Sequence, residues 1–246
     1  MTIPAANPVA VEVTRGQSLE TAFVESRHRA SCAVVAADGT IVHGWGDIEQ
    51  QVFPRSAIKP IQALPLIETG AADAFGYSAA EISLACASHH AEDRHINTVT
   101  DILGRIGLTP DALECGPKIS IDEAVKIERL KKGVEARRLG SDCSGKHTGF
   151  LATAVHMGED PAGYIGRSHP VQQRIFQTIS EMCDVDVSTL PEGIDGCSIP
   201  ALAIPLSALA LGMAKLANPT GLGAVREAAA DRVVQSVAAE PFMIAG

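Results

Sequence analysis

Apolar residues alternate with turn signals in the first part of the chain and recur at helical spacing further on. Residues 29–37 and 41–45 are apolar runs on either side of Asp38-Gly39. Asp-Gly between two such runs is typical of a β-hairpin whose two central turn residues need positive φ. The pattern therefore predicts an N-terminal hairpin, with residues 9–13 as a candidate adjoining strand.

From Ser56 onward the spacing becomes helical. Apolar residues recur every three positions and the run ends at Gly70, which predicts a helix here. Ser78 and Glu81 have the spacing of a capping box, and they predict the start of a short helix that ends near Ser88. The same patterns predict further helices at 93–107, 122–132, 145–157, 170–183, 200–217 and 222–239.

These elements fit one mixed α/β domain over residues 1–246, with strands in 1–55 and mainly helices in 56–246. Two or three strands form a poor independent sheet. Either the helices cover this small sheet, or the strands that complete it lie elsewhere.

The charge balance opposes two classes of partner. Acidic residues outnumber basic ones by 29 to 20, for a formal net charge of −9. Nucleic acids and anionic membranes both require a cationic face, so we expect neither as a partner. The one basic cluster, at 129–132 and 137–138, is interrupted by apolar and small residues and is typical of a solvated helix face.

Nothing in the sequence predicts secretion or membrane insertion. Residues 1–13 lack the basic and apolar regions of a signal peptide. The most apolar stretch, 199–217, contains Pro200 and Pro205 and predicts a buried core helix rather than a membrane span. Six cysteines without a secretory signal are expected to stay reduced. We therefore expect a cytoplasmic protein.

The first candidate for chemistry is Ser56 with Lys59. Three residues apart on a helix, their Cβ atoms would lie about 5–6 Å apart on one face. A neutral lysine can activate a serine hydroxyl, provided that its pKa is lowered by burial or by a second cation such as Lys146. The same spacing serves the serine β-lactamases. Taken alone, it equally fits a helix N-cap serine followed by a surface lysine.

Two further segments contain chemically capable residues. Ser88 lies among small residues at a predicted helix end, followed by two histidines, which alone suggest a helix terminus facing solvent. Cys143 and Cys197 lie beside glycines and polar residues and could supply thiolates to Zn²⁺, with Lys146 or His147 completing part of the shell. Taken alone, each cysteine equally fits a small buried apolar residue.

Taken together, four segments resemble the rhizobial-type L-asparaginase (asparaginase II) family. They are RSAIKP (55–60), CASHH (86–90), DCSGKH (142–147) and DGCSIP (195–200), and they occur in this order and spacing. The resemblance covers nearly the whole chain. It implies a β-lactamase-like and glutaminase-like fold, with a sheet flanked by helices and a helical subdomain. It also implies a homodimer that hydrolyses L-asparagine to aspartate and ammonia.

The resemblance also implies roles for particular residues. Ser56 and Lys59 would form one Ser–Lys pair, and Ser88 would be a second active-site serine. A zinc ion would be held by Cys143, Lys146 and Cys197, with the lysine as a neutral amine, and would favour substrate binding. We expect Arg55, His147 and Asp195 to support substrate binding. In the family, Ser88 pairs with a lysine in a later segment, so we expect this chain to lack the C-terminal part of the fold.

Three alternatives remain open from the sequence. The first is a glutaminase or β-lactamase-like serine hydrolase, although Lys-Thr-Gly and Ser-Asp-Asn motifs are absent. The second is a zinc hydrolase in which metal-bound water attacks. The third is a non-catalytic, zinc-binding dimeric fragment.

Overall fold

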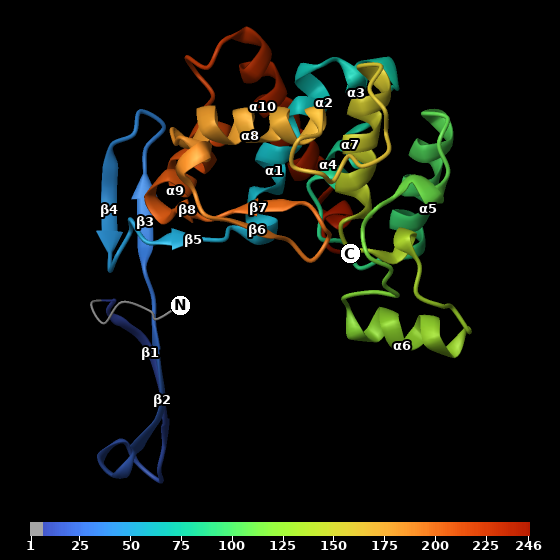
Figure 1. Ribbon diagram of the computed structural model, residues 1–246. Helices are drawn as coiled ribbons and strands as arrows, with labels where there is room; N and C mark the ends of the chain where they lie inside the picture. The colour runs from blue at the N-terminus through green and yellow to red at the C-terminus, as the bar shows by residue number, and fades with distance from the viewer. Residues whose placement is uncertain (1–6) are drawn as a thin grey trace.

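The computed structural model describes residues 7–246 (Figure 1). Residues 1–6, part of the segment in which no signal peptide is predicted, lie outside the described residues. The strands are β1 (Val9–Arg15), β2 (Phe23–Arg29), β3 (Cys32–Val35), β4 (Ile41–Trp45), β5 (Gln51–Val52), β6 (Glu192–Ile194), β7 (Pro200–Leu202) and β8 (Ile204–Pro205). The helices are α1 (Lys59–Gln62), α2 (Leu64–Glu68), α3 (Ala71–Ala74), α4 (Ala79–Ala85), α5 (Asp93–Arg105), α6 (Glu123–Lys131), α7 (Ser144–His156), α8 (Pro170–Cys183), α9 (Leu206–Ala217) and α10 (Ala224–Ala239).

The mixed α/β class predicted from the sequence is confirmed. The described strands pair two by two, as β1–β2, β3–β4, β5–β8 and β6–β7. They do not join into the single flanked sheet that the resemblance implies. In Figure 1, β1 and β2 extend away from the helical body as an arm, and β1 pairs with β2 rather than with the predicted hairpin.

The predicted hairpin is β3–β4, but its turn is longer than the two-residue turn expected. Ala36 and Thr40 close the loop through a backbone hydrogen bond of 2.9 Å, and Gly39 donates to the Ala36 carbonyl at 3.0 Å. Within this loop, only Gly39 has positive φ, at 89°. A three-residue loop with one left-handed glycine is a common hairpin connection, and the register shifts further along the hairpin, between the Val35–Ile41 and Val34–His43 pairs.

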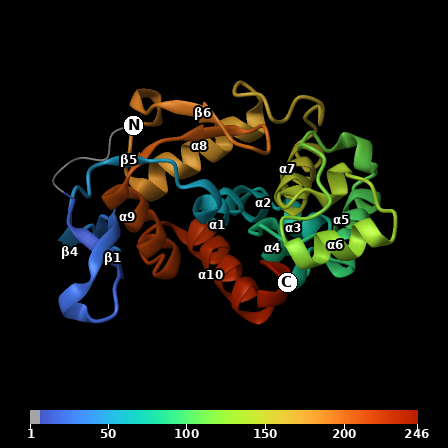
Figure 2. The ribbon, with the colours of Figure 1, turned by 90° about the horizontal axis from the view of Figure 1, so that it is seen from below.

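The predicted helix after Ser56 is divided into short pieces. A 3₁₀ turn (Arg55–Ile58) runs into α1 and then α2, each with a proline in its first turn, and Gly70 ends the run with φ 84°. Proline favours such a first turn because its missing N–H has no intrahelical partner there. α8 contacts α1 and α2, and α10 contacts α2, so both short helices lie within the helical body (Figure 2).

The prediction of one buried helix over 200–217 is wrong for its first part. Residues 200–202 and 204–205 form β7 and β8, and the helix begins only at Leu206. β8 pairs with β5, and β7 pairs with β6. These pairings bring the chain just before Ser56 beside the chain that follows the fourth motif.

α7 is the central helix of the body and contacts α2, α3, α4, α5 and α8. It is buried without interruption from Ser144 to Ala154. A Cβ on Gly145 would lie 2.5 Å from both the Cγ and the carbonyl oxygen of Leu84. The absence of a side chain at Gly145 therefore allows the first turn of α7 to approach the end of α4, which places the second and third motifs side by side.

Two surface expectations can be compared with the structure. The basic cluster at 129–132 is not wholly solvated, because Arg129 is 8% exposed and forms a 2.8 Å ion pair with Asp93. Lys132 of the same cluster is exposed, as expected.

Across residues 7–246, every helix falls short of the length or the apolarity that crossing a membrane requires.

The capping box at the start of α4 forms as predicted. The Ser78 N–H donates to Glu81 Oε2 at 2.6 Å, and the Glu81 N–H donates to Ser78 Oγ at 3.4 Å. We expect Ser78→Ala to lower the free energy of unfolding by about 1 kcal/mol, because it leaves a helix-terminal N–H without its partner. Urea denaturation measures this change, and an unchanged midpoint would show that the cap contributes nothing.

Candidate active site

Ser56, Lys59 and Ser88 meet at one place, although Ser56 lies in the 3₁₀ turn before α1, Lys59 begins α1 and Ser88 follows α4. Lys59 Nζ donates to the Ala87 carbonyl and to Ser88 Oγ, both at 2.6 Å. Ser88 Oγ in turn lies 2.7 Å from Ser56 Oγ. In the described part of the chain, the serine bonded directly to Lys59 is therefore Ser88, and Ser56 is linked to Lys59 through it.

Lys59 has the environment that a lysine base needs. Its side chain is 1% exposed, and the neighbouring Ile58 and Ile61 are buried as well. Burial lowers the pKa of Lys59, the nearby Cys143 opposes this, and the positive charge of Lys146 lowers the pKa further. An apolar setting and a second cation are the two causes that the sequence predicted for a lowered lysine pKa.

His89, next to Ser88, does not face solvent as a helix terminus would suggest. It is 0% exposed, its Nδ1 accepts the Ala91 N–H at 3.1 Å, and its Nε2 lies 3.0 Å from Ser144 Oγ. The His89 N–H also donates to the Asp142 carbonyl at 3.2 Å. Burial lowers the pKa of His89 to about 3, so the ring is neutral. His89 thus ties the Ser88 segment to the first turn of α7.

Unusual backbone conformations concentrate in the motif segments. Among the described residues other than glycine, positive φ occurs at Arg55 (51°), Ala91 (59°), Asp184 (53°) and Ser198 (78°). Three of these four lie in or next to the first, second and fourth motifs. Such conformations are unfavourable for residues with a Cβ and persist where the surrounding structure imposes them, often at functional sites.

The predicted zinc ligands Cys143, Lys146 and Cys197 come together, and all are buried. Lys146 Nζ donates to Cys197 Sγ at 3.2 Å. Hydrogen bonding with Cys197 raises the pKa of the Cys143 thiol, and hydrogen bonding with Cys143 lowers the pKa of Cys197. In residues 7–246, no group of three His, Cys, Asp or Glu side chains has the arrangement of a metal site. The predicted set differs from such a group because its third donor is an amine.

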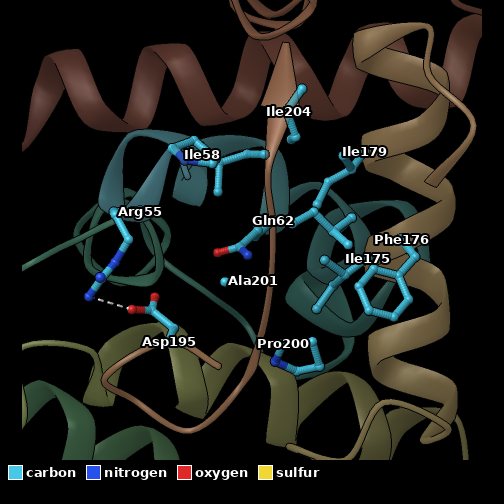
Figure 3. A pocket seen from close by; sticks show the side chains of 12 residues that line it. Arg55, Ile58, Gln62, Ile175, Phe176, Ile179, Asp195, Pro200, Ala201 and Ile204 are labelled. Atoms are coloured by element: carbon cyan, nitrogen blue, oxygen red, sulfur yellow. Dashed lines mark ion pairs between the residues drawn. The ribbon is translucent and has the colours of Figure 1, made fainter. Parts of the chain in front are cut away.

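Arg55 and Asp195, both predicted to support substrate binding, form an ion pair of 2.8 Å beside Ser56 (Figure 3). The guanidinium side chain is 63% exposed and the carboxylate 15%. Asp195 Oδ1 also accepts the Gly196 N–H at 2.7 Å, which fixes its orientation. The pair therefore presents a positive group and a negative group together at the edge of the site.

A small cavity of about 20 Å³ lies against this ion pair, and the Gln62 amide points into it (Figure 3). This volume accommodates about one water molecule, so asparagine does not fit inside it. A substrate that contacts Arg55 would therefore lie outside this cavity, and Ser56, the next residue in the chain, is exposed. The cavity walls are mostly apolar: Ile58, Ile175, Phe176, Ile179, Leu202 and Ile204.

We expect Asp195→Asn to raise KM for asparagine about 10- to 100-fold with a smaller effect on kcat. The reason is that the neutral amide would lose a charge-assisted hydrogen bond between the Asp195 carboxylate and the α-ammonium group of asparagine, and such a bond is worth about 1.5–3 kcal/mol. Steady-state kinetics measures both constants. Asp231→Asn, on the exposed face of α10, is the control. A kcat loss with unchanged KM would remove Asp195 from substrate binding.

His147 lies deeper than a substrate-binding residue should. Its ring is 0% exposed, and its Nδ1 lies 2.6 Å from the hydroxyl of Tyr164, which is also fully buried. Direct contact with a substrate is therefore not supported by this position. The sequence did not indicate Tyr164 or the buried role of His89, because an isolated tyrosine in a glycine-containing loop carries no motif.

Comparison with known protein families gives an identification that does not depend on the site geometry. The family model for L-asparaginase II matches residues 11–246, a range that contains all four motifs. No individually curated protein matches the sequence significantly. Since the match extends over nearly the whole chain, the protein belongs to the L-asparaginase II family and is an asparaginase-type amidohydrolase.

Proposed function

We propose that the protein hydrolyses L-asparagine to L-aspartate and ammonia through an acyl-enzyme formed on Ser56. The observation that carries this proposal is the continuous hydrogen-bonded chain from the exposed Ser56 through Ser88 to the buried Lys59. A serine needs a base to become a nucleophile, and a lysine can act as that base only when it is neutral. The lowered pKa of Lys59 supports this role.

The proton path follows from the donors and acceptors present. A neutral Lys59 amine can keep its N–H bond to Ala87 and accept the Ser88 proton with its lone pair. Ser88 Oγ can then accept the Ser56 proton as Ser56 Oγ bonds to the side-chain amide carbon of asparagine. The proton held by Lys59 returns to the leaving nitrogen, which departs as ammonia. Water then gives a proton to Lys59 through Ser88 and attacks the ester carbon, and that proton returns to Ser56 Oγ as the ester bond breaks and aspartate leaves.

Substrate orientation is assigned to the ion pair beside the nucleophile. The Arg55 guanidinium matches the α-carboxylate of asparagine, and the Asp195 carboxylate matches its α-ammonium group. Binding exchanges one ion pair within the protein for two with the substrate. This arrangement fixes the amino-acid end and leaves the side-chain amide free to reach Ser56.

We also propose a zinc ion held by Cys143, Lys146 and Cys197. The donor set fits, because two buried sulfurs and an amine converge and the pKa of Cys197 is lowered, which favours the thiolate that zinc requires. When bound, the zinc supplies a Lewis acid that favours substrate binding. A homodimer and a cytoplasmic location remain predictions.

The deciding experiment measures ammonia release from asparagine and from glutamine, and the colour change of a chromogenic cephalosporin, with the purified chain before and after chelation. We expect hydrolysis of asparagine in preference to the other two, and a chelator that raises KM more than it lowers the maximal rate. Loss of the maximal rate on chelation would favour a zinc hydrolase. A folded protein that releases no ammonia from asparagine would contradict the proposal.

A further inference from the structure

The segment that carries Ser88 runs from the end of α4 to the start of α5 without regular secondary structure. Ala91, within this segment, is fully buried and has positive φ, at 59°. Such a conformation is unfavourable for a residue with a Cβ and persists only where surrounding contacts impose it. The position of the Ser88 hydroxyl between Ser56 and Lys59 therefore depends on contacts from outside the segment.

One set of these contacts is a stack of three nearly parallel rings. The ring centroids of His89 and His95 are 5.0 Å apart, with 17° between the ring planes, and those of His95 and Phe242 are 5.1 Å apart, with 1°. Both spacings are typical of stacked aromatic pairs. The guanidinium carbon of Arg94 lies 5.4 Å from the Phe242 ring centroid and adds a cation–π contact. The stack connects the residue next to Ser88 with the 3₁₀ turn that contains Phe242.

Hydrogen bonds fix the orientation of the middle ring. Nδ1 of His95 accepts the Glu92 N–H at 3.2 Å. A nitrogen that accepts an amide hydrogen carries none of its own, so the hydrogen of the neutral ring is on Nε2. Nε2 then donates to the Phe242 carbonyl at 3.1 Å. Both nitrogens of His95 are thereby satisfied, and the ring cannot turn without losing these bonds.

The chain around Phe242 also contacts the Ser88 segment through its backbone. The His90 N–H donates to the Ala245 carbonyl at 2.9 Å. On the other side, Ser83 Oγ of α4 donates to the carbonyl of residue 240 at 2.8 Å. This part of the chain is therefore anchored to α4 and reaches the segment that follows α4.

We propose that Phe242 and His95 are positioning residues that, through His89, hold Ser88 where it links the nucleophile to its base. The catalytic part of this inference rests on the proposed function, because only there does Ser88 carry a proton. The hold on the segment does not depend on it. Substrate orientation is assigned to other residues, so loss of the stack should lower kcat and leave KM nearly unchanged.

The first test is steady-state kinetics of the full chain with asparagine. Phe242→Leu should lower kcat about 10- to 100-fold, because a displacement of about 1 Å at a reacting group has an effect of this size. Phe242→Tyr keeps the ring, and the cavity of about 360 Å³ that Phe242 borders leaves room beside it, so kcat should stay near the wild-type value. The matched control is Phe75→Leu, because Phe75 is also partly buried and packs against a histidine, His156, with centroids 6.2 Å apart. Equal kcat in Phe242→Leu and in the wild type would overturn the inference.

The second test is backbone amide hydrogen exchange, which does not depend on asparagine hydrolysis. The His89 N–H donates to the Asp142 carbonyl at 3.2 Å, and the His90 N–H donates to the Ala245 carbonyl. Phe242→Leu should speed exchange at both amides, because the segment opens locally without the stack, whereas Phe75→Leu should not. Faster exchange at His90 alone would show that only the chain around Phe242 has loosened, and it would contradict the hold on Ser88.

The two tests separate this inference from the proposed function. If the wild type does not hydrolyse asparagine, the proposed function fails and hydrogen exchange alone decides whether the stack holds the segment. If Phe242→Leu does not fold, as its melting curve would show, His95→Gln decides, because it removes the middle ring and keeps an amide donor for the Phe242 carbonyl. His95→Gln should then show the same kcat loss and the same faster exchange. A purely structural role for Phe242 would lower the melting temperature without a kcat loss that tyrosine restores.

Discussion

Lys59→Met is expected to lower kcat for asparagine hydrolysis about 10²- to 10⁴-fold, the usual contribution of a general base. Methionine has a similar length but no lone pair able to take the Ser88 proton. Removing a buried amine offsets the cost of leaving the Ala87 carbonyl without its donor, so we expect the melting temperature to change little. Lys132→Met, at an exposed lysine, is the control for loss of a positive charge. Full activity in Lys59→Met would remove this lysine from the mechanism.

The pH dependence of the wild-type protein tests the same role of Lys59. Burial lowers the pKa of Lys59 below its ordinary value of 10.5, and only the neutral amine can accept a proton. We therefore expect kcat/KM to fall as the pH decreases through this lowered pKa. Between that pKa and 10.5 the unfolded state binds more protons, so the stability contribution of Lys59 increases with pH in that window. Lys59→Met should abolish both dependences.

Ser56→Ala is expected to lower kcat by on the order of 10⁴ or more, the loss typical of removing a nucleophile. The reason is that Ser56 is the exposed end of the hydrogen-bonded chain, where a substrate can reach it. Ser88→Ala removes only the link to Lys59, and a water molecule can partly replace it, so its loss should be smaller, about 10²- to 10⁴-fold. Ser188→Ala, at an exposed serine far along the chain, is the control.

Mass spectrometry of acid-quenched reactions distinguishes the two serines more directly than rates do. A β-aspartyl adduct should form on the peptide that contains Ser56 in the wild type and should be absent in Ser56→Ala. Its appearance on the peptide that contains Ser88 would make Ser88 the nucleophile, with Lys59 as its direct base. That outcome would keep the Ser–Lys chemistry but contradict the proton path proposed above.

Local features of the fold could be predicted because their causes are local. The hairpin depends on Asp38-Gly39 between apolar runs, and the start of α4 depends on Ser78 and Glu81, each pair within a few residues. The strands at 200–205 were missed because the same apolar residues also fit a helix, and pairing with β5 and β6 decided between the two. Periodicity cannot resolve short apolar runs whose partner strands are distant in sequence.

The identity of the family and the residue types of its site were determined by the sequence alone, since four short motifs carry them. Which serine contacts Lys59, and the burial of His89 and His147, were decided only by the tertiary structure. The physical reason is that α7 packs against α4 at Gly145 and thereby joins segments about 55 residues apart, such as His89 and Ser144. Contacts of that kind depend on packing between elements, which no local pattern encodes.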